Sequence, residues 1–117
     1  MRRLVIDDIR VFPFECVYAR TLEDGFKLIE TVQEGDELWL DHDLSSLDTI
    51  RPIVTHIEQS AFEAYEYPTT KKSYPFNQIV TVTDNPVGQL WIWAALSQYY
   101  PMEHYNGPST YLTNGVW

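Results

Sequence analysis

The chain alternates short apolar runs with longer segments in which apolar residues recur every three or four positions. The runs are typical of buried strands and predict strands at residues 3–7, 15–19, 37–41 and 78–83. The periodic segments predict helices at residues 22–34, 49–64 and 86–100. Thr21 and Asn85 are suitable N-caps for the first and third helices, and Asp48 or Thr49 for the second.

Strands that alternate with helices indicate a mainly parallel sheet with both faces covered. One connection is unusual, because residues 8–14 are too few for a helical crossover between the first two strands. We therefore expect an α/β three-layer sandwich with a mainly parallel sheet of four or five strands, in which the first crossover helix is missing. Residues 65–77 predict an aromatic loop, and residues 101–117 an irregular tail in which residues 111–117 could add a short edge strand.

Length and composition limit the range of functions. A chain of 117 residues is long enough for one domain, residues 1–117, with a sizeable core. Its formal net charge of −9 argues against a protein that grips the backbone of duplex nucleic acid. No apolar run is long enough to span a membrane, and the single cysteine, Cys16, fits a reducing cytoplasm.

Acidic residues follow two of the predicted strands. Asp7 and Asp8 follow the first strand, and Asp41 ends the third. The carboxyl ends of parallel strands meet at one rim, and ligands bind there near the point where the strand order reverses. Carboxylates so close together repel each other unless one is protonated or a cation lies among them. Oxygen ligands of this kind suit Mg²⁺ (or Mn²⁺), so the sequence predicts a metal at these three acids.

Further residues near this rim are candidates for ligand contacts. His42 lies between two acids, and it could carry a proton near neutral pH or pack as a structural residue. Asp43 lies on the same side of an extended strand as Asp41 and could orient a group in the site. Thr83, after the fourth strand, could donate a hydrogen bond to a phosphate. Arg51, in the first turn of a helix, could reach a phosphate over the rim or pair with a neighbouring acid.

Four short motifs occur in order along the chain: VIDDIR at 5–10, LDHDL at 40–44, DTIRP at 48–52 and NPVG at 85–88. Together they resemble the motifs of receiver domains, and more closely those of the compact cyclic-phosphate-processing receiver domains. The similarity extends from about residue 4 to residue 100, and that family also lacks the first helix. The resemblance implies a receiver-like, flavodoxin-like fold that binds or processes a cyclic phosphate at a metal-dependent acidic site.

The resemblance also implies roles for individual residues. Asp7 and Asp8 correspond to the metal-binding acids of receivers, and Asp41 to their phospho-accepting aspartate. Asp41 would therefore either help to hold the metal or attack the phosphate as a nucleophile. The predicted site has metal ligands Asp7, Asp8 and Asp41, catalytic residues Asp41, His42 and Asp43, and ligand-binding residues Arg10, Arg51, Thr83 and Asn85.

Two positions depart from the family pattern. Receivers carry a lysine after their fifth strand, and this chain has no lysine beyond Lys72. The compact family often has histidine just before the hydroxyl residue of the fourth strand, where this chain has Val82. Phosphotransfer from a histidine kinase is therefore not expected.

Three hypotheses follow from these observations. The first is a Mg²⁺-dependent hydrolase of a cyclic phosphodiester, either a cyclic nucleotide or a small ligand that ends in a cyclic phosphate. The second is a protein that binds such a nucleotide without turnover, which the two departures favour. The third is a catalytically inactive receiver-like module that binds another protein through its aromatic helix and tail.

The helix predicted at 86–100 is apolar at consecutive positions 90–96, so its apolar surface is wider than the single stripe that a sheet can cover. Either the tail from Tyr105 to Trp117 covers the second face, or another subunit does. Because two-fold assemblies are the commonest oligomers, we expect a homodimer through this helix.

Overall fold

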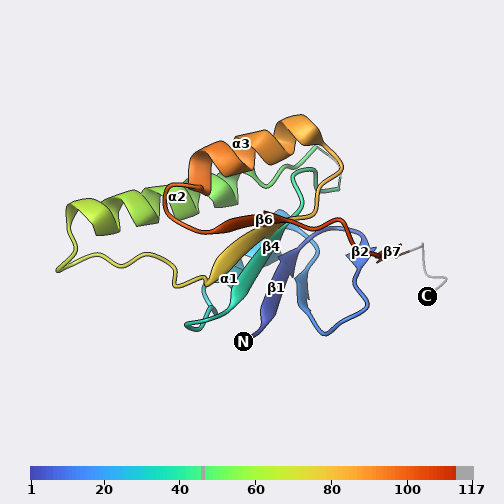
Figure 1. Ribbon diagram of the computed structural model, residues 1–117, viewed down its shortest axis with the longest axis horizontal. Helices are drawn as coiled ribbons and strands as arrows, with labels where there is room; N and C mark the ends of the chain where they lie inside the picture. The colour runs from blue at the N-terminus through green and yellow to red at the C-terminus, as the bar shows by residue number, and fades with distance from the viewer. Residues whose placement is uncertain (46, 113–117) are drawn as a thin grey trace.

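Figure 1 shows the computed structural model, in which residues 1–45 and 47–112 are described. The helices are α1 (Leu22–Ile29), α2 (Arg51–Glu66) and α3 (Pro86–Leu96). The strands are β1 (Arg3–Ile6), β2 (Arg10–Val11), β3 (Val17–Ala19), β4 (Glu37–Leu40), β5 (Gln78–Thr81), β6 (Met102–His104) and β7 (Thr110–Tyr111). Residues 8–14 contain the short strand β2 and no helix, so the missing crossover is confirmed.

Five strands form one parallel sheet in the order β3-β1-β4-β5-β6, which confirms the α/β fold. β1 is the first strand in the chain, and β3 pairs with one of its edges. The chain then crosses over, and β4 pairs with the other edge of β1. The strand order therefore reverses between β1 and β4, and the carboxyl ends of these two strands face a crevice. β2 and β7 form a separate antiparallel pair.

Side-chain caps set the starts of α1 and α3 as predicted. Thr21 Oγ1 accepts the amide of Asp24 at 3.1 Å, and Asn85 Oδ1 accepts the amide of Gly88 at 3.0 Å. These bonds satisfy amides that have no partner inside the helix. For α2 the predicted cap is displaced: the helix begins after Ile50, which is fully buried and makes no side-chain cap, while Thr49 Oγ1 accepts the amide of Arg51 at 3.3 Å.

All three helices pack against the same face of the sheet. Alternate strand residues point to this face: Leu4, Ile6, Leu38, Leu40 and Ile79. They meet Ile29 of α1, Ile53 and Ile57 of α2, and Ile92 and Leu96 of α3. Burial of these side chains supplies most of the stabilisation that holds β1, β4 and β5 in register, and so it fixes where their polar ends lie.

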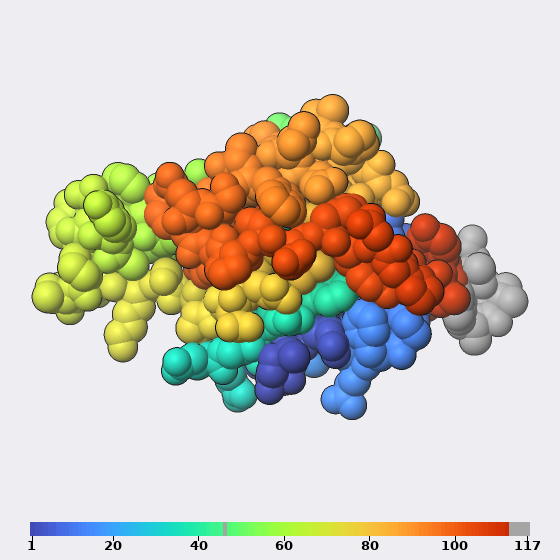
Figure 2. Space-filling model, in the orientation of Figure 1, coloured from blue at the N-terminus to red at the C-terminus, as the bar shows by residue number. Residues whose placement is uncertain are grey.

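The opposite face is covered by aromatic side chains instead of a helix. Phe12 and Phe14, from the connector after β1, lie 5.2 and 5.3 Å from the ring of Trp39 in β4. Tyr105, which follows β6, lies 5.1 Å from the same ring. Figure 2 shows the C-terminal segment, in red, lying against this connector, in light blue. The third layer of the sandwich is therefore aromatic, and it replaces the missing crossover helix.

The fifth strand comes from the segment that the sequence predicts as an irregular tail. β6 pairs with the free edge of β5, where Ile79 N–H donates to Pro101 O and Tyr105 N–H to Thr81 O, each at 2.9 Å. Because the partner groups belong to the neighbouring strand, the local sequence of residues 102–104 does not predict a strand there. β7 overlaps the start of the edge strand predicted at 111–117, of which residues 113–117 lie outside the described residues.

The predicted helix ends are also displaced. α1 and α3 end earlier than expected, whereas α2 continues through Glu66 into the loop predicted at 65–77. The rest of that loop precedes β5, so it lies at the amino ends of the strands, away from the polar rim (Figure 1). The loop packs on its own aromatic side chains, with the rings of Tyr74 and Phe76 stacked at 5.9 Å.

Among the described residues, no helix combines the length and apolar character needed to cross a bilayer.

Candidate functional site

Asp7 and Asp41 lie side by side at the carboxyl ends of β1 and β4. The sheet hydrogen bonds continue one residue past each strand, because Asp7 N–H donates to Ala19 O and Asp41 N–H to Ile6 O, both at 3.1 Å. Asp7 is fully buried and Asp41 is 6% exposed. Asp8 is half-buried beside them, and one carboxylate oxygen from each of the three acids lies within 4.8 Å of the others. The three acids predicted as metal ligands are therefore brought together.

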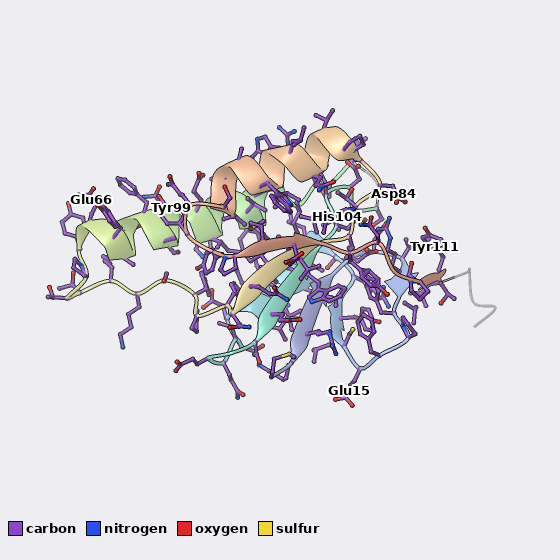
Figure 3. All side chains as sticks on the ribbon, viewed as in Figure 1. Glu15, Glu66, Asp84, Tyr99, His104 and Tyr111 are labelled. Atoms are coloured by element: carbon purple, nitrogen blue, oxygen red, sulfur yellow. The ribbon has the colours of Figure 1, made fainter. Side chains whose placement is uncertain are left out.

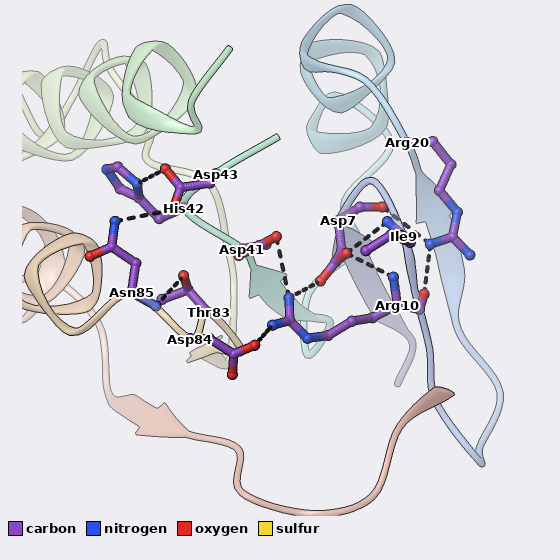
Figure 4. Close-up of polar contacts among 10 residues, drawn as sticks. All are labelled: Asp7, Ile9, Arg10, Arg20, Asp41, His42, Asp43, Thr83, Asp84 and Asn85. Carbon is purple, nitrogen blue, oxygen red and sulfur yellow. Dashed lines mark hydrogen bonds and ion pairs between the residues drawn. The ribbon is translucent and has the colours of Figure 1, made fainter. Parts of the chain in front are cut away.

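Arg10 is buried among these acids (Figure 4). Its Nη1 lies 2.9 Å from Asp7 Oδ2 and 3.2 Å from Asp41 Oδ2, and its Nη2 lies 2.8 Å from Asp84 Oδ2. Asp84 is largely exposed, so this last ion pair lies at the surface. Arg10 thus reaches from the buried acids to solvent.

The backbone around Asp7 is held by its own carboxylate and by Arg20, a residue that the predicted site did not include. Asp7 Oδ1 accepts the amides of Ile9 and Arg10 at 2.9 Å, which turns the chain sharply after β1. Arg20 Nη1 donates to the carbonyl oxygens of Asp7 and Arg10 at 3.2 and 2.6 Å. Arg20 follows β3, which neighbours β1 in the sheet, and only that strand pairing links it to the site.

The three acids of the cluster outnumber the guanidinium groups beside them. Burial, and then the charge of Asp7, raise the pKa of Asp41 to about 6, although Arg10 and a hydrogen bond from Thr83 act in the opposite direction. Burial and the charge of Asp7 also raise the pKa of Asp8. Arg10, together with Arg20 at Asp8, thus leaves the negative charge of the cluster only partly balanced, and a further cation would be attracted to it.

The residues fit a hard divalent cation. Three carboxylate oxygens are the ligand type that Mg²⁺ takes from proteins, and its remaining positions usually go to water and phosphate. Asp7, Asp8 and Asp41 would hold it.

A cavity of about 460 Å³ opens beside the cluster. Asp41, Asp43 and Thr83 line it together, and Arg10 and Asp84 form another part of its wall. Neither Asp84 nor Tyr111, which also lines the cavity, belongs to the predicted site. Asp84 lies next to the predicted Thr83, whereas Tyr111 reaches the cavity only because β7 pairs with β2.

Asp43 is fixed at the edge of this cavity by two neighbours. Asn85 Nδ2 donates to Asp43 Oδ2 at 3.0 Å, and Nδ1 of His42 lies 2.9 Å from Asp43 Oδ1. The Asn85 and His42 hydrogen bonds lower the pKa of Asp43, so it is ionised at neutral pH. Thr83 is buried, its Oγ1 accepts the amide of Asn85 at 3.1 Å, and its hydroxyl donates to the carboxylate of Asp41, which lines the same cavity.

His42 and Arg51 lie on the other side of Asp43. The ring of His42 is buried and points away from Asp41 (Figure 4). Arg51 Nε donates to His42 Nε2 at 3.0 Å, and its guanidinium lies 4.6 Å from the ring centre of Trp91. Neither residue lines the cavity beside Asp41. The predicted proton transfer by His42 and phosphate contact by Arg51 stay predictions, and both groups already have protein partners.

Comparison with known proteins agrees with this geometry. The model of the family described as the cyclic-phosphate processing receiver domain matches residues 2–98. The match covers β1 to α3, and so it includes the three clustered acids and the loop that carries Thr83. No curated protein and no solved structure matches the chain. The chain belongs to the family of cyclic-phosphate processing receiver domains.

Proposed function

We propose that this protein binds a cyclic phosphodiester at the Asp7–Asp8–Asp41 cluster together with Mg²⁺ or Mn²⁺, and that it hydrolyses this ligand. The observation that carries the proposal is the buried acidic cluster, whose charge Arg10 balances only in part, beside an open cavity. An anionic phosphate would be repelled by such a cavity without an added cation.

Side chains around the cavity would contact the phosphate and the attacking water. Arg10 presents positive charge at the wall, and the hydroxyl of Thr83, which donates to Asp41, would turn to a phosphate oxygen once a cation occupied the Asp41 carboxylate. Asp43 is ionised and held by Asn85, so it is placed to accept a hydrogen bond from an attacking water. Bound Mg²⁺ would supply positive charge to the phosphate oxygens and make a nearby water more acidic.

One observation favours binding without turnover as the second candidate function. Both ring nitrogens of His42 have protein partners, Arg51 and Asp43, so this ring is not free to accept a proton from a water or return one. A cavity that holds a cation and offers a hydrogen-bond donor to the phosphate would then capture the ligand and hold it.

Calorimetry with MgCl₂ and MnCl₂ tests the metal site. We expect the wild type to bind at least one ion, and Asp8→Asn and Asp41→Asn to lose this binding. Asp24→Asn is the matched control, because Asp24 is an exposed acid in the first turn of α1. Asp7 is a poorer choice, since its carboxylate also holds the backbone turn. If the wild type binds neither ion at millimolar concentration, the proposal fails.

Incubation with 2′,3′- and 3′,5′-cyclic nucleotides separates the two functions. Release of a phosphomonoester that EDTA and Asp41→Asn both abolish supports hydrolysis. Metal-dependent binding without any product supports capture instead.

A further inference from the structure

A second cavity, of about 400 Å³, adjoins the acidic one. The two cavities share Arg10, Asp84 and Tyr111 and therefore adjoin at these residues. Figure 3 shows Asp84, His104 and Tyr111 gathered at the same end of the molecule. The volume lies within the range of ligand pockets, roughly 300–1,000 Å³.

The walls of this second cavity come mainly from residues 104–111, beyond the region that matches the family model. This segment is anchored at several points. The Tyr105 ring packs on Phe12 at 5.4 Å and its hydroxyl donates to Pro108 O at 2.8 Å. A Cβ on Gly107 would lie 2.5 Å from the Tyr105 ring, so a larger residue there would force this ring to shift. β7 then pairs with β2, and the wall is therefore fixed to the chain that carries Arg10.

The lining groups suit a flat heteroaromatic ring. Tyr111 is 47% exposed, and stacking on an exposed aromatic ring is a common way to hold a nucleobase. Asn106, Ser109 and His104 also line the cavity, and their side chains can exchange hydrogen bonds with the polar edge of a base. Arg10 touches both cavities, so it can contact the phosphate on one side and the attached nucleoside on the other.

We infer that the protein takes nucleoside cyclic phosphates, with the phosphate in the acidic cavity and the base in the cavity built by residues 104–111. This inference rests on the function proposed above and names the substrate class. The C-terminal segment then determines specificity, because the acidic cavity alone recognises only a phosphodiester.

The experiment compares two probes in the presence of MgCl₂: adenosine 2′,3′-cyclic phosphate and methyl riboside 2,3-cyclic phosphate, in which a methyl group replaces the base. We expect the wild type to bind the adenosine probe about tenfold more tightly, a typical effect of stacking one base. Tyr111→Ala removes the stacking ring, and Ser109→Phe fills the cavity. Both should bring the two affinities close together, and Ser109→Phe, at a residue that lines the second cavity and not the acidic one, should leave that of the methyl riboside unchanged. Tyr65→Ala, at an exposed tyrosine of α2, is the matched control.

The outcomes separate this inference from the proposed function. Equal binding of both probes to the wild type overturns the second cavity while the acidic site stands. The same conclusion follows if both variants keep the preference for adenosine. If neither probe binds, the proposed function itself fails, and the inference fails with it.

Discussion

Arg51 donates its Nε–H to Nε2 of His42 at 3.0 Å. A ring nitrogen that accepts a hydrogen bond carries no proton, so the proton of a neutral His42 ring must lie on Nδ1, which faces Asp43 at 2.9 Å. The arrangement links α2 to the edge of the acidic cavity through one imidazole.

We predict that His42 is present as the Nδ1–H tautomer. Nitrogen-15 NMR of the histidine ring at neutral pH measures this directly, because protonated and unprotonated ring nitrogens resonate far apart. Arg51→Met removes the donor and should allow the other tautomer to appear. A wild-type ring protonated on Nε2 would contradict the hydrogen bond from Arg51, and His42 would again be a candidate for proton transfer.

Gly88→Ala should destabilise the protein. A Cβ at Gly88 would lie 2.4 Å from Cγ of the buried His42 ring, and overpacking of this kind costs about 1–3 kcal/mol. Without such a clash, alanine in a helix would instead be favoured over glycine by about 1 kcal/mol, so the sign of the change in unfolding free energy decides. Urea unfolding of Gly88→Ala, His42→Ala and the double variant forms the test. A sum of single effects with no coupling would show that the ring does not press on α3.

The acidic rim could be predicted because it depends on strand order and local pattern alone. Four apolar runs identify four strands, and carboxyl ends of adjacent parallel strands must lie near each other. Asp7 and Asp41 therefore meet once β1 and β4 are known to be neighbours. The absence of the crossover helix could be predicted just as directly, because residues 8–14 are too few to form one.

Other parts depend on contacts between distant segments and leave no local signal. β6 forms because β5 offers a free edge, although its three residues show no apolar run. Arg20 reaches the site only through the pairing of β3 with β1, and Tyr111 only through the pairing of β7 with β2. The burial of His42 under α3 likewise needs the packed helix, since the same residue pattern fits a proton carrier at the rim.

The homodimer through α3 remains a proposal, on a narrower surface than the sequence suggests. Trp91 contacts Arg51, and Trp93 Nε1 donates to Thr81 Oγ1 at 3.1 Å, so both tryptophans have partners within the chain. Val87 and Leu90 are each 69% exposed on one side of α3. The tail as described, to residue 112, runs to β2 and pairs there instead of covering this helix (Figure 1).

We expect light scattering at micromolar concentration to give the mass of a dimer, and Leu90→Glu to give that of a monomer. Leu47→Glu is the matched control, because Leu47 is 98% exposed and lies outside α3. A monomeric wild type would show that the Val87–Leu90 surface is simply solvated.

Asp41→Asn should stabilise the protein at neutral pH, although it removes a metal ligand. The pKa of Asp41 is raised from 3.8 to about 6 by burial and by the charge of Asp7. Between about pH 4 and pH 6 the unfolded chain loses this proton while the folded chain keeps it, so stability from this group falls as the pH rises. The penalty is complete above that window, and asparagine removes it. We expect a gain on the order of 2 kcal/mol at pH 7.5 and almost none at pH 4.

Thermal or urea unfolding at both pH values, without added metal, measures this gain. Asp43→Asn is the informative control, because the hydrogen bonds from Asn85 and His42 lower the pKa of Asp43, and its replacement should therefore reduce stability at neutral pH. Adding Mg²⁺ should stabilise the wild type and leave Asp41→Asn unaffected, since a ligand that binds only the folded state raises its stability. If Asp41→Asn is less stable than the wild type at pH 7.5 without metal, then the ion pair with Arg10 outweighs burial and repulsion, and the acidic cluster is already neutralised by the protein itself.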